Sequence, residues 1–89
     1  SLKDLPLGQN FAATLSGPDL PTPASGKLTL CSREAVGWDG TFEPDHSEAL
    51  NVDFLIALAT TIAVENLRAQ QIDVVGVNSE DHLFLRWVE

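Results

Sequence analysis

Apolar residues between positions 54 and 64 recur on nearly every side of a helix instead of along one stripe. Asn51 can cap such a helix at its start, and Asp53 in the first turn interacts favourably with the helix dipole. Arg68, near the other end, suits the carbonyl groups left unpaired there. The pattern therefore predicts one long central helix over residues 51–71.

This predicted helix carries two apolar stripes when each residue is turned by about 100°. We expect the bulkier stripe, which includes Leu58 and Ile62, to pack on a sheet. We expect the second stripe to form a homodimer interface, because two-fold symmetric pairing is the commonest kind of oligomer. An N-terminal arm, residues 1–8, folded over a monomer would explain the same residues. The predicted interface residues are Val52, Ile56, Ala59, Ala63 and Leu67.

The rest of the chain alternates apolar and polar residues, which is typical of strands. Alternation predicts strands over 11–15 and 27–33, on either side of a loop at 17–26 that is rich in Pro and Gly. Asp39 and Gly40 lie between Trp38 and Phe42, and an Asp-Gly pair in this setting predicts a hairpin turn.

A second hairpin is predicted near the C-terminus, between the β-branched segment 72–78 and the segment 83–89. The second of these segments places Leu83, Leu85 and Trp87 on one face. The fold class predicted is α+β: an antiparallel sheet of about four to six strands carrying one long central helix. The element order is β-β-β-α-β-β, in a single domain spanning residues 1–89.

The charge is strongly acidic, with 13 acidic residues against five basic ones and a net charge of −8. Lys and Arg are absent between residues 34 and 67. Such a chain repels phosphate groups, so nucleic acid and anionic membranes are disfavoured as partners. We instead expect a partner protein with a basic surface. The acidic loop predicted to face it contains Asp39, Glu43, Asp45 and Glu48.

Cys31 is the only cysteine, so the chain forms no intramolecular disulfide, and we expect a small apolar filler at this position. The first ten residues lack the apolar core of a signal peptide, and the run 54–64 is too short to span a membrane. These features favour the cytoplasm.

Chemical motifs are sparse. The acids of the predicted loop, together with His46, could gather around a divalent cation, but their spacing matches no EF-hand. His82 follows two acids and could act as a metal ligand or general base, but a polar surface turn explains it without such a role and is the preferred interpretation. The sequence therefore predicts no catalytic residue, no metal site and no cofactor.

Three functions remain for such a chain. The first is a non-enzymatic protein-interaction module, homodimeric, which binds another protein. The second is an acidic inhibitor or nucleic-acid mimic that occupies a basic site on its target. The third is a small enzyme or a metal- or ligand-binding subunit that uses His46, His82 and the acidic residues.

Overall fold

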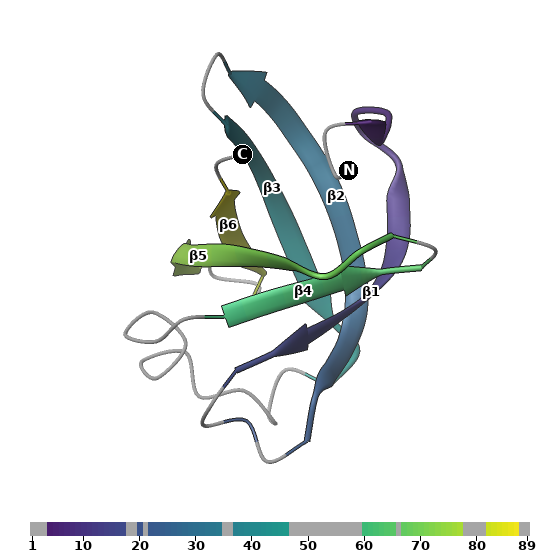
Figure 1. Ribbon diagram of the computed structural model, residues 1–89, viewed down its shortest axis with the longest axis vertical. Coiled ribbons are helices and arrows are strands. Elements are labelled where there is room, and N and C mark those ends of the chain that lie inside the picture. The colour runs from purple at the N-terminus through teal and green to yellow at the C-terminus, as the bar shows by residue number, and fades with distance from the viewer. Residues whose placement is uncertain are drawn as a thin grey trace.

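The computed structural model describes residues 4–17, 20, 22–34, 37–46, 60–65, 67–77 and 82–87. Within these ranges the chain forms six strands and no α-helix. All the strand pairs are antiparallel, and the ring of strands closes in the order β1-β2-β3-β6-β5-β4 (Figure 1). The strands are β1 (Asn10–Ser16), β2 (Ala24–Glu34), β3 (Gly37–Pro44), β4 (Thr60–Val64), β5 (Gln70–Val77) and β6 (Leu83–Trp87).

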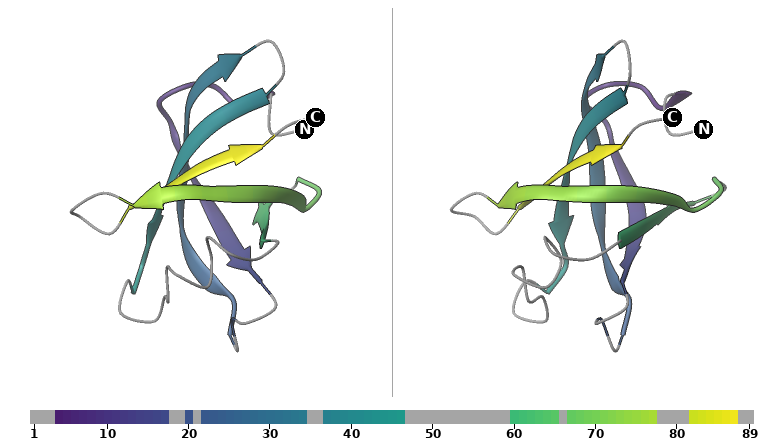
Figure 2. Two further views of the ribbon diagram at one scale, coloured as in Figure 1. Left: turned by 90° about the vertical axis from the view of Figure 1, so that its left-hand side faces the viewer. Right: turned by 60° about the vertical axis from the view of Figure 1, so that its left-hand side comes forward.

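Strand β1 closes the barrel, because it pairs with β2 along one edge and with β4 along the other. Ala13 lies opposite Gly26 of β2 and also opposite Val64 of β4. Closing a sheet in this way gives every strand two neighbours and removes the free edges that would otherwise pair with other chains. Strand β5 lies three places from β2 around the ring, and Figure 2 shows it crossing the direction of β2 and β3. Strong tilt of this kind is what closure of a small barrel requires.

The barrel interior is filled by side chains at alternate positions of each strand. This follows from strand geometry, because successive side chains point to opposite faces and one face of a closed sheet is the inside. On β6, for example, Leu83, Leu85 and Trp87 are buried, whereas Phe84 and Arg86 are exposed. The fully buried apolar side chains include Leu15, Leu28, Leu30, Phe42, Ile62 and Leu83.

Two glycines make room for aromatic rings inside the barrel. A Cβ atom on Gly26 would collide with the carbonyl oxygen of Glu43 and would lie only 2.6 Å from Cζ of Phe42. A Cβ atom on Gly40 would lie 3.1 Å from both Cη2 and Cζ3 of Trp87. The rings of Phe42 and Trp87 therefore occupy the space that a side chain would need at these glycines.

Each of β2 and β5 contains one extra residue that disturbs the pairing. The register shifts between Leu30 and Ser32 in β2, which leaves Cys31 as the inserted residue, and between Val74 and Gly76 in β5. Such bulges bend a strand and increase its twist, which helps a sheet of this size to close. Cys31 is exposed at its bulge, so the prediction of a small apolar filler is wrong.

The N-terminal arm lies against β2 over the part that the structure describes. The backbone N–H of Gly8 donates to the carbonyl of Leu30 at 3.0 Å, and Arg33 donates through Nη2 to the carbonyl of Leu5. The Leu5 side chain is partly buried against the core.

The predicted α+β fold, with its order β-β-β-α-β-β, is wrong, because residues 60–64 of the predicted central helix form β4 and residues 70–71 begin β5. Ile62 and Val64 point into the barrel, whereas Thr61 and Ala63 are exposed, which is the period of a strand. Short apolar runs are compatible with either a helix or a strand. In residues 60–64 most side chains are β-branched, which favours a strand where neighbouring strands can pair with it. Residues 51–59 of the predicted helix lie outside the described residues. Across the described ranges, no helix has the length and apolar character that crossing a membrane requires.

The predicted hairpin turn at Asp39-Gly40 is also wrong. Strand β3 runs without interruption from Gly37 to Pro44, and Gly40 pairs with Leu30 on β2. Trp38, Gly40 and Phe42 all face the interior, so Gly40 serves the packing of Trp87 and not a turn. The predicted hairpin between 72–78 and 83–89 is confirmed, since β5 and β6 pair antiparallel with Asp73 opposite Arg86.

Candidate functional site

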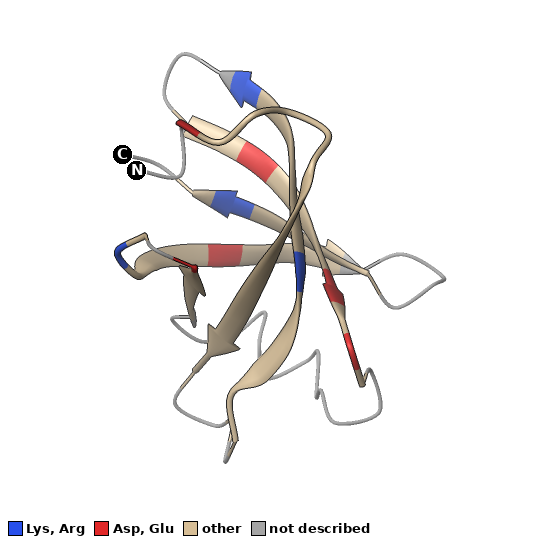
Figure 3. Cartoon of the chain, turned by 90° about the vertical axis from the view of Figure 1, so that its right-hand side faces the viewer, with Lys and Arg blue, Asp and Glu red and all other residues tan. Residues whose placement is uncertain are grey.

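A row of charges crosses the outer surface of three neighbouring strands. Arg86 on β6 lies opposite Asp39 on β3 and opposite Asp73 on β5. Figure 3 shows these as a blue band on β6 between red bands on β3 and β5. Nε of Arg86 donates to Oδ1 of Asp39 at 2.9 Å. Both side chains are partly exposed, so we expect this ion pair to contribute less to stability than to the arrangement of the surface.

An apolar centre lies beside this row, at the bulge of β5. Phe84 is 40% exposed and Val75, the bulged residue, is 52% exposed. Phe84 lies opposite Gly76, where an added Cβ would stand 3.7 Å from Cδ2 of the ring. The ring lies beside the backbone of β5 and leaves room for a methyl group at Gly76. The site thus presents an exposed aromatic ring next to a glycine of the neighbouring strand.

The far side of this centre carries a second acid, on the same outer face of β3. Oε1 of Glu43 lies 4.0 Å from Nε2 of His82, at the start of β6. Thr41 lies between Asp39 and Glu43 and is opposite Phe84. We name this surface the β3–β6–β5 face, and it consists of Asp39, Thr41, Glu43, Asp73, Val75, His82, Phe84 and Arg86.

The acidic residues expected in one loop are therefore divided between different places. Asp39 and Glu43 lie on the outer side of β3, whereas Asp45 follows that strand and donates its backbone N–H to Ser25 at 2.9 Å. Glu48 lies outside the described residues. His46 lines a small hollow of about 230 Å³ with the segment 22–25, while His82 lies beside Glu43.

The predicted homodimer interface is divided in the same way. Ala63 is exposed on β4, and Leu67 is partly buried against the barrel core. Ala63 also lines a groove of about 390 Å³ across β2, β1 and β4, which contains Asp45 and Glu65 at its border. Val52, Ile56 and Ala59 lie outside the described residues. Ala63 lies on a strand, so the helical stripe that grouped these five residues is not formed there. Homodimerisation stays a prediction, and the stripe no longer supports it.

Sequence reasoning named Asp39, Glu43 and His82 of the β3–β6–β5 face, but it did not select the apolar centre or Arg86. Alternation along 83–89 already placed Phe84 and Arg86 opposite the buried face, which was the available signal. What the alternation could not give was the register, which sets Phe84 beside Gly76 and places Arg86 between two acids.

In the ranges that the structure describes, no three His, Cys, Asp or Glu residues are grouped closely enough to hold a metal ion. We expect EDTA to leave the melting temperature unchanged. A site held at a hundred times its dissociation constant would add about 2.7 kcal/mol to the free energy of unfolding. Removing such an ion would lower the melting temperature by roughly 10 °C or more in a domain of this size. Thermal melts followed by circular dichroism with and without EDTA test this, and a fall of several degrees would contradict it.

The described residues thus define a small antiparallel β-barrel with an apolar, acid-bordered patch on its outer surface. Comparison of the chain with protein-family models, with curated protein sequences and with solved structures gives no match. The function is therefore inferred from the site alone.

Proposed function

We propose that this chain is a non-enzymatic protein-interaction module that binds its partner through the β3–β6–β5 face. The observation that supports this most is the exposed ring of Phe84, which lies opposite Gly76, with the exposed Val75 next to that glycine on β5. Isolated apolar residues on a surface need no explanation, but here two exposed ones occupy neighbouring positions on paired strands within a polar border. Protein interfaces have this organisation, with aromatic anchors at the centre and a polar rim.

The charges of the face favour a basic partner. Asp39, Glu43 and Asp73 border the apolar centre, and among the described residues of the face only Arg86 is permanently positive. The chain as a whole carries a net charge of −8, which attracts a basic partner and speeds its approach. The partner is thus a protein with an apolar contact surrounded by Lys or Arg.

A closed barrel also limits the way in which such a partner docks. Strands β3, β6 and β5 are consecutive in the ring, and β6 is paired along both of its edges. A peptide cannot join β6 as an added strand, since its backbone groups already bond to β3 and β5. Side chains of the face therefore carry the contact.

We expect Phe84→Ser to weaken partner binding by at least about tenfold, because a central aromatic anchor contributes more than 1.4 kcal/mol in a protein interface. The partner is captured from a cell extract with the wild-type protein, identified by mass spectrometry and purified. Affinities for the variants are then measured by isothermal titration calorimetry. Leu7→Ser is the matched control, since Leu7 is 48% exposed and lies on the N-terminal arm away from the face.

The outcomes separate the candidate functions. The proposed face is wrong if Phe84→Ser and Leu7→Ser weaken partner binding equally, or if neither substitution weakens it. If affinity falls steeply with salt but Phe84→Ser has no effect, an acidic inhibitor that binds by charge alone is the better description. Thermal melts of both variants should match the wild type, because both side chains are exposed.

A further inference from the structure

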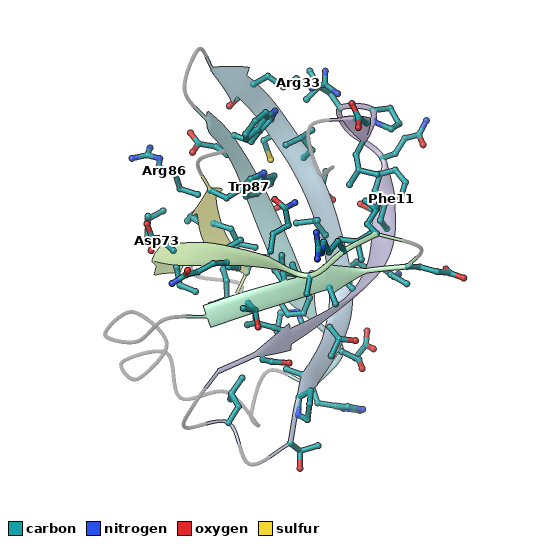
Figure 4. All side chains as sticks on the ribbon, viewed as in Figure 1. Phe11, Arg33, Asp73, Arg86 and Trp87 are labelled. Carbon is teal, nitrogen blue, oxygen red and sulfur yellow. The ribbon has the colours of Figure 1, made fainter. Side chains whose placement is uncertain are left out.

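A groove crosses the outer surface of β4, β1 and β2, on the half of the barrel that the proposed face does not use. These three strands are consecutive in the ring, and β3, β6 and β5 form the other half. In Figure 4, Phe11 on β1 lies on the opposite side of the barrel from Asp73 and Arg86, which belong to the β3–β6–β5 face. The groove has a volume of about 390 Å³. A partner bound in it is therefore separate from one bound at the face.

Small residues on three paired strands make this groove. Thr14 on β1 lies opposite Ser25 on β2 and opposite Ala63 on β4, and all three line the groove. The row beside them, which contains Ala13 and Gly26, is buried and leaves its backbone on the outer side. Since none of the outward side chains in the row is larger than that of threonine, the backbone of the strands forms the floor of the groove.

Two carboxylates lie at opposite ends of the groove. Asp45 follows β3, and its backbone N–H donates to the carbonyl of Ser25 on β2 at 2.9 Å. Glu65 follows β4, and its backbone N–H donates to the carbonyl of Ala12 on β1 at 3.4 Å. Strands β1 and β2 therefore lie between the two acids. Since neighbouring strands are about 4.8 Å apart, the three steps from β3 to β4 separate the backbones of the two acids by roughly 14 Å around the barrel.

The lining of the groove is acidic. Asp45 and Glu65 are exposed, and the residues that line the groove include no Lys, Arg or His. Lys27 lies on the same outer side of β2, but it is opposite Glu43 on β3 and does not line the groove. A second copy of this chain is a poor occupant, because each copy carries a net charge of −8. The groove thus fits a positively charged partner.

We propose that this groove binds an extended, basic segment of a partner protein, with two Lys or Arg side chains four residues apart and small residues between them. An extended chain advances about 3.3 Å per residue, so four residues span about 13 Å, close to the separation of the two acids. Side chains an even number of residues apart point to the same side, so both cations face the groove. The hydroxyl groups of Thr14 and Ser25 provide hydrogen bonds to the backbone of such a segment.

Two synthetic peptides of identical composition, GKASAKG and GAKSKAG, test the spacing, each with an acetylated N-terminus and an amidated C-terminus. The lysines are four residues apart in the first peptide and two apart in the second. We expect the first to bind at low salt with a dissociation constant below about 1 mM. It should shift the backbone amide NMR signals of Ala12, Thr14, Ser25 and Ala63. The second should bind about threefold more weakly, because only one of its lysines reaches a carboxylate at a time.

Substitutions in the groove provide the matched test. Asp45→Asn and Glu65→Gln together should weaken binding of GKASAKG about tenfold, the product of two exposed ion pairs of about threefold each. The double variant should also lose the preference between the two peptides. Ala63→Leu should weaken binding without changing the charge, because leucine fills part of the groove. Asp4→Asn removes a charge from the N-terminal arm, which does not line the groove, and should leave the affinity unchanged.

Three results would overturn the proposal. They are the absence of saturable binding of GKASAKG below about 1 mM, equal affinity for the two peptides, and equal weakening by Asp4→Asn and Asp45→Asn. The last would mean that the peptide responds only to the net charge of the chain. The comparison of the two peptides uses the unaltered protein, so it holds even if a variant fails to fold. Phe84→Ser lies on the other half of the barrel and should bind GKASAKG as the wild type does, so this proposal and the proposed function can fail separately.

Discussion

Val64→Asp is expected to leave the chain unfolded at 25 °C, whereas Ala63→Asp leaves it folded. Val64 is 4% exposed and points into the barrel from β4, while Ala63, its neighbour, points outward. An aspartate at 64 places an uncompensated charge among apolar side chains, which costs several kcal/mol. A domain of this size has a total stability of only about 4–13 kcal/mol, so little or none would remain.

This pair of substitutions tests the strand directly, because a helix predicts the opposite ranking. On a helix over 51–71, Val64 would fall outside the two apolar stripes, on the side that carries Thr60 and Arg68, whereas Ala63 would fall on the second stripe. Far-UV circular dichroism and thermal melts of the two variants provide the measurement. A folded Val64→Asp protein together with an unfolded or altered Ala63→Asp protein would count against β4.

Gly26→Ala is expected to lower the free energy of unfolding by about 3 kcal/mol, at the upper end of what overpacking a core costs. The added methyl group would meet the carbonyl oxygen of Glu43 and the ring of Phe42. The carbonyl belongs to the pairing of β2 with β3, and the ring is fully buried, so neither can move away easily. For a domain of this size the melting temperature should fall by roughly 12–24 °C.

The matched control for this prediction is Gly76→Ala on the outer side of β5. Its Cβ would meet only Cδ2 of Phe84, at the ordinary contact distance of 3.7 Å. We expect a change of less than about 4 °C, because no overlap is created and alanine restricts the unfolded chain slightly. Differential scanning calorimetry of both variants measures the difference. Similar melting temperatures for Gly26→Ala and Gly76→Ala would show that Phe42 does not pack over Gly26.

Alternation in the sequence predicted several elements of this barrel correctly. The strand over 27–33 lies within β2, the segment 72–78 overlaps most of β5, and the segment 83–89 contains β6, which pairs with β5. The buried side chains Leu83, Leu85 and Trp87 were predicted to share one face. These predictions hold because a side-chain period of two is a local property of the backbone and depends little on the partner strand.

The sequence alone could not place the candidate site. Asp39 and Glu43 were predicted to lie in a loop, since an Asp-Gly pair between apolar residues is a strong turn signal. In the structure both lie on the outer side of β3, because Gly40 accommodates the ring of Trp87 from β6. That requirement arises more than forty positions away in the chain, and no local pattern contains it.

The sequence by itself determined an acidic chain, the alternation of buried and exposed residues along β2 and β6, and the C-terminal hairpin, all of which follow from residue types and their local spacing. Only the tertiary structure decided whether residues 60–64 form a helix or a strand, since a short apolar run is compatible with both. The choice was made by closure of the barrel, in which β4 pairs with β1 and β5. Backbone hydrogen bonds to β1 and β5, and burial of Ile62 and Val64 in the core of the barrel, outweigh the helix preference of a short apolar run.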